Sequence, residues 1–249
     1  MKLRVLGSNG TYPTPGRPAS GYLIEHEGVR VWLDAGSGTF VALQEVLPAV
    51  DVDALVISHI HPDHCADIFP LFNLFRYGPD PRSGFPVLVP EGAADHLATF
   101  ARAGDNHSFF EIFDFRTVGS GEEASLGAIR LTFGRADHSV PTIVTRAETA
   151  GRSLTYSADT GTAGDLPDLA AGATVLLCEA SYQGPGEEKP WPYHLTASEA
   201  GAIAREALAG RLVLTHLMPA LDPSRSLAEA EAAFGRPTEH AVPGAEVTV

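Results

Sequence analysis

Hydrophobic residues occur along the chain in many short runs, most of which end in a polar or glycine-rich turn. Runs of about four to eight residues rich in branched and aromatic side chains are typical of β-strands. The pattern predicts strands at residues 2–7, 22–26, 29–34, 54–58, 86–90, 129–133, 142–146, 153–157, 174–178 and 211–216. Because the early strands follow one another as hairpins and the later ones alternate with helices, we expect a mixed pair of sheets covered by helices.

Apolar residues with helical spacing predict helices at residues 38–47, 65–77, 92–102, 197–209 and 225–234. The fourth of these has a capping-box pattern at Thr196 and Glu199, and Gly210 follows its end. Residues 103–125 are expected to be a loop-rich excursion that shapes a rim or an interface. No repeat or linker divides the chain, so we expect one α/β (α+β) domain over residues 1–249.

The charge balance is acidic and narrows the choice of partners. Seventeen Lys and Arg residues face 31 Asp and Glu residues, which gives a formal net charge of −14, and Lys2 and Lys189 are the two lysines. A protein that holds a long nucleic acid usually presents a basic patch. The composition therefore disfavours a long polynucleotide, but it is compatible with a small phosphate ester bound at metal ions.

The termini and cysteines bear on location. The first apolar run is short and reaches a glycine at Gly7, so no signal peptide is expected. No stretch of about 18 apolar residues is present, so no membrane span is expected. Cys65 and Cys178 are the two cysteines, too few for a disulfide framework, and a cytoplasmic protein is predicted.

The densest candidate chemistry lies in "VISHIHPDHCAD", residues 56–67, which holds His59, His61, Asp63 and His64. Neutral imidazoles and carboxylates suit zinc, and also manganese or iron, better than they suit calcium. Residues two apart in an extended segment point the same way, so His59 and His61 can bind one ion. Asp63 and His64 lie further along the turn and can bind a second ion.

Three further candidate ligands, His138, Asp159 and His216, follow or end predicted strands. Strand ends are where α/β proteins gather catalytic groups. His138 would complete the first ion site and His216 the second, and Asp159 would bridge them because a carboxylate has two oxygens. Two ions about 3.5–4 Å apart can activate one water for in-line displacement. Asp34, also at a strand end, is either a turn residue or an acceptor that orients a ligand histidine.

The HIHPDH motif, followed in order by His138, Asp159 and His216, resembles the metallo-β-lactamase superfamily. The resemblance runs from "VLGSNGTYPTPGRPASGYLIE" to "LVLTHLMP" and implies a four-layer αββα sandwich with a two-metal site at its edge. The motif is specific for the superfamily and not for a reaction. "CEASY" and "HLTASEAG" place Glu179 and His194 where the ribonuclease Z-like branch has a glutamate and a proton-donating histidine. The segments "SGYL", "DHC", "SADTG" and "CEAS" are most similar to the small bacterial cyclic-nucleotide phosphodiesterases of that branch.

The resemblance implies a hydrolase with two divalent metal ions, Zn²⁺ in first place and Mn²⁺ or Fe²⁺ as alternatives. Its expected substrate is a small phosphodiester, a cyclic nucleotide above others, with no long nucleic acid and no membrane as partner. Asp63 would orient or deprotonate a water whose pKa the ions lower to about 7. His194, oriented by Glu179, would protonate the departing alkoxide.

Four alternatives stay open. A ribonuclease Z-like tRNA 3′-end endonuclease would need a long arm, but only 21 positions separate His138 from Asp159. Other hydrolases of the superfamily act on a thioester, lactone or β-lactam, and these chemistries need the Glu179–His194 pair less. Di-iron redox relatives usually replace the second motif histidine by glutamate, whereas His61 is intact. The last is a metal-binding scaffold without catalysis. The sequence fixes neither the nucleotide base, nor the native metal, nor the oligomeric state, so a homodimer stays open.

Overall fold

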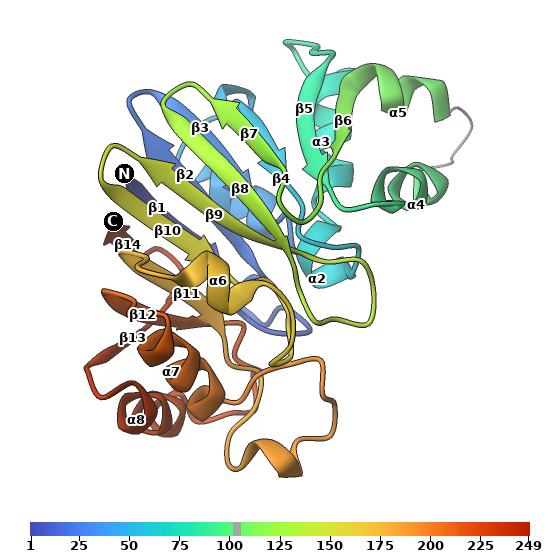
Figure 1. Cartoon of the computed structure of the whole chain (residues 1–249). Helices are drawn as coiled ribbons and strands as arrows, with labels where there is room; N and C mark the ends of the chain where they lie inside the picture. The colour runs from blue at the N-terminus through green and yellow to red at the C-terminus, as the bar shows by residue number, and fades with distance from the viewer. Residues whose placement is uncertain (102–105) are drawn as a thin grey trace.

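Two β-sheets packed face to face form the centre of the molecule (Figure 1). The computed structural model describes residues 1–101 and 106–249, without the side chains of residues 106 and 107. Within these residues, the first sheet has the strand order β14 (Glu246–Thr248), β1 (Lys2–Gly7), β2 (Gly21–His26), β3 (Val29–Leu33), β4 (Ala54–Val56), β5 (Phe85–Val89) and β6 (Phe113–Thr117). The second has the order β13 (Thr238–His240), β12 (Arg211–Thr215), β11 (Val175–Glu179), β10 (Arg152–Tyr156), β9 (Ile143–Thr149), β8 (Ile129–Arg135) and β7 (Glu123–Leu126).

Each sheet is antiparallel on one side and parallel on the other. In the first sheet β14, β1, β2 and β3 pair antiparallel, and β3 to β6 pair parallel. In the second sheet β7 to β10 pair antiparallel, and β10 to β13 pair parallel. The prediction of a mixed sheet pair is confirmed.

Helices cover the outer face of each sheet, which gives four layers (Figure 1). The first sheet is covered by α1 (Thr39–Gln44), α3 (Ile68–Tyr77), α4 (Ala93–Phe100) and α5 (Asn106–Ile112), and α2 (Pro62–Cys65) lies at its end. The second sheet is covered by α6 (Leu166–Ala170), α7 (Ala197–Glu206) and α8 (Pro223–Phe234). Single 3₁₀ turns lie at Ala49–Asp51 and Gly186–Glu188.

Alternation along the strands explains why the sheets are buried on both faces. In β3, Val31 and Leu33 point into the core between the sheets, while Trp32 packs under the outer helices. In β11, Leu177 points inward and Leu176 packs against the α7–α8 layer. Successive strand residues face opposite sides, so a continuous apolar run supplies two cores at once.

The excursion predicted at residues 103–125 is wrong for its described part, because α5, β6 and β7 occupy most of it. Phe109 and Phe113 are buried in the outer core of the first sheet with ring centroids 5.0 Å apart. Charged residues such as Glu111 and Asp114 interrupt this aromatic run, so no clear period shows in the sequence, and burial of the rings decides the structure. Residues 103–105 lie outside the described residues.

Two further differences concern short elements. The helix predicted at residues 65–77 is two helices, α2 and α3. The edge strands β13 and β14 and the short helix α6 were not predicted, because three to five residues are too few to show a period.

The capping box is confirmed, since the Thr196 side chain accepts a hydrogen bond from the Glu199 N–H. No helix of the described residues has the length and apolarity needed to cross a membrane.

Candidate metal centre and active site

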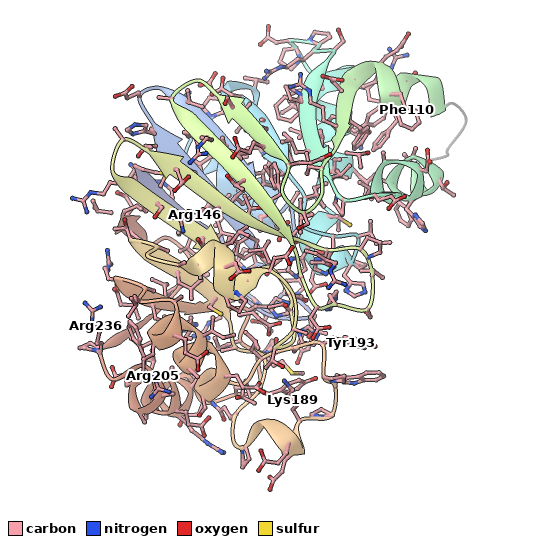
Figure 2. All side chains as sticks on the ribbon, viewed as in Figure 1. Phe110, Arg146, Lys189, Tyr193, Arg205 and Arg236 are labelled. Carbon is pink, nitrogen blue, oxygen red and sulfur yellow. The ribbon has the colours of Figure 1, made fainter. Side chains whose placement is uncertain are left out.

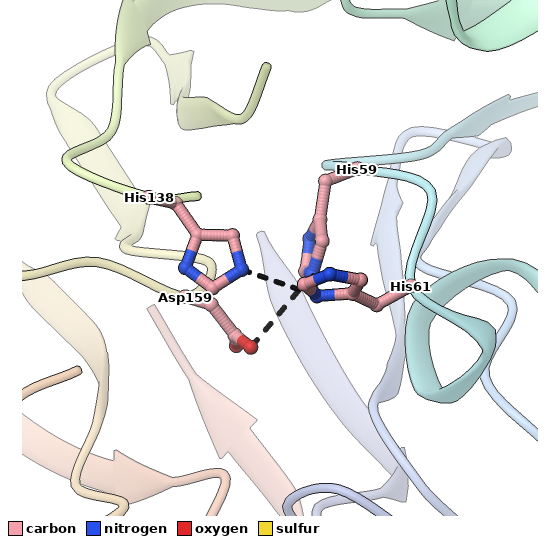
Figure 3. A group of neighbouring side chains, drawn as sticks. All are labelled: His59, His61, His138 and Asp159. Carbon is pink, nitrogen blue, oxygen red and sulfur yellow. Dashed lines mark hydrogen bonds and ion pairs between the residues drawn. The ribbon is translucent and has the colours of Figure 1, made fainter. Parts of the chain in front are cut away.

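The structure brings the seven predicted ligands together at one end of the sheet pair, in two groups that share one carboxylate. The first ligand group consists of His59, His61, His138 and Asp159, and the second consists of Asp63, His64, Asp159 and His216. Within each group, one donor atom of every residue lies within 4.8 Å of those of the others. Figure 3 shows His138 and Asp159 facing His59 and His61 across a small gap.

Strained backbone positions carry the site residues out of the sheets. Asp34 follows β3 with φ 56°, Ala158 follows β10 with φ 52°, and His216 follows β12 with φ 52°. Non-glycine residues in the left-handed region cost energy and cluster at functional sites. Each of these residues turns the chain where a candidate side chain leaves its strand.

The motif loop is held against the end of β3 by backbone contacts. The Ser20 N–H donates to the Asp63 carbonyl at 3.1 Å, and the Ala35 N–H donates to the His64 carbonyl at 2.8 Å. A Cβ at Gly36 would lie 2.1 Å from the Asp63 carbonyl oxygen, so a larger residue would push the loop away. The loop therefore has a fixed position before any ligand side chain is considered.

The histidines of the first ligand group converge on one point. His61 Nδ1 lies 3.0 Å from His59 Nε2 and 3.1 Å from His138 Nε2, and Asp159 Oδ2 is 3.7 Å from His59 Nε2. Burial lowers the pKa of His59, of His61 and of His138, which favours neutral imidazoles. Neutral imidazole nitrogens aimed at one point suit a divalent transition metal.

The second ligand group is richer in carboxylates. Asp159 Oδ1 lies 3.2 Å from His64 Nε2 and 3.4 Å from His216 Nε2, and Asp63 Oδ2 lies 3.2 Å from His216 Nε2. Asp159 thus turns one oxygen to each group, as a bridging ligand would. The buried His64 Nε2 and Asp159 Oδ1 atoms have no hydrogen-bond partner among the described residues. Buried polar atoms are normally satisfied, so the donor set fits a bound cation.

Four of the five histidines have their outer nitrogen held, which leaves Nε2 for an ion. The Nδ1 contacts are His59 to Ser58 Oγ at 3.0 Å, His64 to Asp34 Oδ2 at 2.7 Å, His138 to the Tyr193 carbonyl at 3.2 Å and His216 to Ser181 Oγ at 2.9 Å. Such outer partners fix the tautomer and ring orientation of a metal-binding histidine.

Asp34 is the centre of the outer network, which favours the orienting role over that of a turn residue. It is fully buried and accepts hydrogen bonds from Ser58 N–H at 2.6 Å, Ser58 Oγ at 2.8 Å and Tyr156 Oη at 2.7 Å, besides the contact to His64. Tyr156 comes from the second sheet, so Asp34 links both sheets to His64 directly and to His59 through Ser58 Oγ.

Glu179 and His194 form a pair beside the shared carboxylate. His194 Nδ1 lies 3.0 Å from Glu179 Oε1 and 3.9 Å from Asp159 Oδ2. Burial opposes protonation of His194, but the Glu179 carboxylate outweighs it and raises the pKa of His194 to about 9 in the metal-free protein. The same two residues with His216 could also hold an ion. Metal binding and proton donation are thus competing roles for His194.

A cavity of about 370 Å³ opens over the centre. Its walls include His61, His138, Tyr182, Trp191, Tyr193 and His194. The volume lies near the lower end of the range of about 300–1,000 Å³ for small-molecule sites. The pocket therefore suits a small ligand.

Sequence reasoning missed the residues that hold the ligands from outside. Ser58 directly precedes the first motif histidine and Ser181 follows Glu179 by two positions, so adjacency was an available signal for both. The Tyr193 carbonyl has no signal of this kind, since any residue type offers one.

Comparisons with known proteins agree with this arrangement. A beta-lactamase superfamily domain model matches residues 19–217. An uncharacterized protein of Mycobacterium leprae is 35% identical over 98% of this chain and 87% of its own length. A ribonuclease Z of Methanopyrus kandleri is 29% identical over 94% of this chain and 93% of its own. The crystal structure of the metallo-beta-lactamase fold protein YhfI from Bacillus subtilis matches with a TM-score of 0.87 and 25% identity, covering 99% and 98% of the two chains.

A two-sheet sandwich with clustered histidines and carboxylates at one edge, matched by a beta-lactamase superfamily model and by relatives named metallo-hydrolase and ribonuclease Z, identifies a hydrolase of the metallo-β-lactamase fold. Because the family model covers most of the chain, this protein belongs to the metallo-β-lactamase superfamily, among relatives of the ribonuclease Z type. The predictions of fold, superfamily and enzyme class are confirmed.

Proposed function

We propose that this hydrolase is a dinuclear phosphodiesterase that cleaves a small phosphodiester, a cyclic nucleotide above others. The observation that carries the proposal is the Glu179–His194 pair next to Asp159. An alkoxide leaving from phosphorus needs a proton, whereas a thiolate leaves well without one. A positioned donor beside the candidate metal centre therefore favours the phosphodiester over a thioester.

In this proposal each of the two ligand groups would hold one ion, and Asp159 belongs to both groups. The imidazole-rich donor set favours zinc. Bound divalent ions would neutralise the phosphate and lower the pKa of the attacking water. His59, His61 and His138 supply one set of donors, and Asp63, His64 and His216 the other.

Asp63 orients the attacking water. Burial opposes ionisation, but His64 and His216 outweigh it and hold the pKa of Asp63 well below its usual range. The Thr11 N–H donates to Asp63 Oδ2 at 2.8 Å, which further fixes the carboxylate. A carboxylate with a lowered pKa is a weak base. Asp63 is therefore better suited to accept a hydrogen bond from the water than to remove its proton.

His194, which lines the cavity, protonates the leaving oxygen. Its Nδ1 is held by Glu179, and Glu179 is held in turn by the Thr160 N–H at 2.7 Å and by Ser181 Oγ at 2.7 Å. The remaining nitrogen of His194, Nε2, is the one available to a substrate in the cavity that this residue lines. The Glu179 carboxylate thereby positions the donor.

A tRNA 3′-end endonuclease is the second candidate, favoured by the relative named ribonuclease Z. Against it stands the segment between His138 and Asp159, where β9 and β10 form an antiparallel hairpin joined by Ala150 and Gly151. This short hairpin was expected from the sequence and leaves no length for an arm that could hold tRNA. The formal charge of −14 also opposes a polyanionic substrate.

The test is a substrate panel of 3′,5′- and 2′,3′-cyclic nucleotides, linear dinucleotides and pre-tRNA, assayed with the metal-loaded protein. We expect the fastest turnover on a cyclic nucleotide and little cleavage of pre-tRNA. The His59→Ala variant, purified in parallel, controls for a contaminating hydrolase and should be inactive on every substrate. Pre-tRNA cleavage at a rate that rivals the cyclic substrate would contradict the proposal.

A further inference from the structure

One wall of the cavity is aromatic and comes from the segment between β11 and α7. Trp191 and Tyr193 lie there with Tyr182, and 62% of the Trp191 side chain is exposed. Figure 2 shows this segment at the lower right, where Lys189 and Tyr193 are labelled. Because Trp191 is exposed in the wall of a pocket that candidate metal ligands also line, its indole offers a flat apolar surface to a ligand bound there.

The segment is tied down at both ends, so Trp191 has a defined place. The Tyr182 N–H donates to the Leu195 carbonyl at 3.1 Å, and the Ala197 N–H donates to the Tyr182 carbonyl at 3.0 Å. Lys189 Nζ lies 2.9 and 3.0 Å from the two carboxylate oxygens of Glu199, the capping residue of α7.

The residues next to Trp191 also touch the candidate centre. The Tyr193 carbonyl accepts from His138 Nδ1 at 3.2 Å. A Cβ at Gly161 would lie 2.4 Å from the Pro192 carbonyl oxygen, so a glycine two residues after Asp159 permits this close approach. The backbone just after Trp191 is therefore held close to the ligand groups, and the aromatic wall lines the same cavity as His61 and His138.

Fixed cations are scarce in the same cavity. Among the described residues that line it, none is Lys or Arg, and the nearby Lys189 is paired with Glu199. A terminal phosphate brings negative charge that needs such a partner. A diester with one negative charge fits this pocket better than a nucleoside diphosphate or triphosphate does.

We propose that Trp191 is the platform on which the nucleobase of a mononucleotide diester stacks, which makes it a specificity-determining residue. The proposal rests on the phosphodiesterase function above and adds the base to the recognised substrate. Every base presents a π-face, and stacking on an aromatic side chain strengthens binding without a fixed hydrogen-bond pattern. Trp191 thus selects for a base and discriminates weakly among bases.

The kinetic test compares a 3′,5′-cyclic nucleotide with the cyclic phosphodiester of methyl riboside, which keeps the sugar phosphate and lacks the base. For Trp191→Ala we expect KM for the nucleotide to rise about 10- to 100-fold, with little change in kcat and none in KM for the base-free diester. Trp191→Phe should recover most of the loss. Tyr77→Ala, which removes an aromatic side chain that is 77% exposed and is not part of this wall, should behave as the wild type.

A second readout does not depend on turnover. The chain has two tryptophans, and Trp32 is fully buried, so a ligand in the cavity can reach Trp191 alone. Adenosine should therefore quench the fluorescence of the metal-loaded protein in a saturable manner, ribose should not, and Trp191→Phe should remove the quenching.

The two arms separate the two proposals. If neither diester is hydrolysed but adenosine quenches Trp191, the phosphodiesterase proposal fails and the base platform stands. If both diesters are hydrolysed and Trp191→Ala raises their KM values equally or not at all, the platform is wrong while the function stands. Absence of quenching by adenosine would also overturn the platform.

Discussion

The two ligand groups share Asp159 and yet differ in charge and in proton affinity. The first group places three histidines around Asp159, and burial lowers the pKa of each of them. The second adds another carboxylate, Asp63, and includes His64. Burial alone would lower the pKa of His64, but Asp159, Asp34 and Asp63 together raise it well above its usual range. In the metal-free protein, protonation is therefore disfavoured at the histidines of the first group and favoured at His64, so an ion would compete with a proton mainly at the second group.

The largest expected effect comes from breaking what the groups share. Asp159→Ala removes the one residue with an oxygen facing each group, so both ions should be lost and all activity with them. Elemental analysis should show about two ions per protomer in the wild type and near none in the variant. His138→Ala is the matched control and should lose mainly one ion. An Asp159→Ala protein that keeps both ions would refute the bridge.

The next effect decides whether His194 donates a proton or binds an ion together with Glu179 and His216. As a proton donor, His194→Ala should slow cyclic-nucleotide hydrolysis by about 10²–10⁴. The hydrolysis of a nitrophenyl phosphodiester, whose leaving group needs no proton, should slow far less. The metal content should not change. Glu179→Gln should show the same pattern more weakly, because Glu179 acts through the imidazole.

The opposite pattern would assign His194 to the metal. If His194→Ala depresses both substrates equally, or removes an ion, the residue is a ligand or a structural group. His59→Ala provides the reference for that outcome, since it should lose metal and both activities together.

The candidate ligands could be predicted more directly in the first half of the chain than in the second. The first half gives four candidate ligands within six positions, a pattern whose spacing alone indicates a metal site. The second half gives His138, Asp159 and His216 one at a time, each at a strand end. Such isolated residues gain meaning only when the fold places them together, so the first motif and the family resemblance were needed to predict them.

Other parts of the molecule left no such signal. The sheets could be predicted because strands that are buried on both faces need continuous apolar runs, such as that of β11. Phe109 and Phe113, by contrast, lie in an aromatic run that charged residues interrupt without a regular period. The outer contacts of the ligands use a serine hydroxyl or a main-chain carbonyl. Hydroxyl and carbonyl groups are common everywhere, so their role depends on the tertiary structure.

A smaller effect should come from a substitution outside the ligand set that weakens metal binding to one ligand group more than to the other. Asp34→Asn deletes the charge that holds His64 Nδ1, and loss of such an outer partner typically costs about 10–100-fold in metal affinity. We expect competition titrations to show this loss for the second ion and a smaller loss for the first, whose His59 Asp34 reaches only through Ser58 Oγ. Asp114→Asn, at an exposed carboxylate paired with Arg116, is the control and should change neither ion. Equal weakening of both ions would mean that Asp34 supports the whole centre.

The smallest effect is a difference in pH dependence. Because the pKa of His64 is raised in the metal-free fold, the contribution of its proton to stability is present at low pH and is lost as the pH rises through the folded-state value. Binding of the second ion must expel the proton, so its affinity should rise about tenfold per pH unit through neutrality.

The first ion should show no such slope above pH 6.5. Burial lowers the pKa of its three histidines, so these imidazoles have no proton to lose when an ion binds above pH 6.5. Below pH 6.5 the same histidines take up protons more readily in the unfolded chain than in the folded one. Acidification below pH 6.5 should therefore destabilise the metal-free fold and release the second ion before the first. Zinc titrations of the metal-free protein at pH 6.5, 7.5 and 8.5 measure both slopes. Equal slopes for the two ions would show that the groups titrate as one site and would remove the distinction between them.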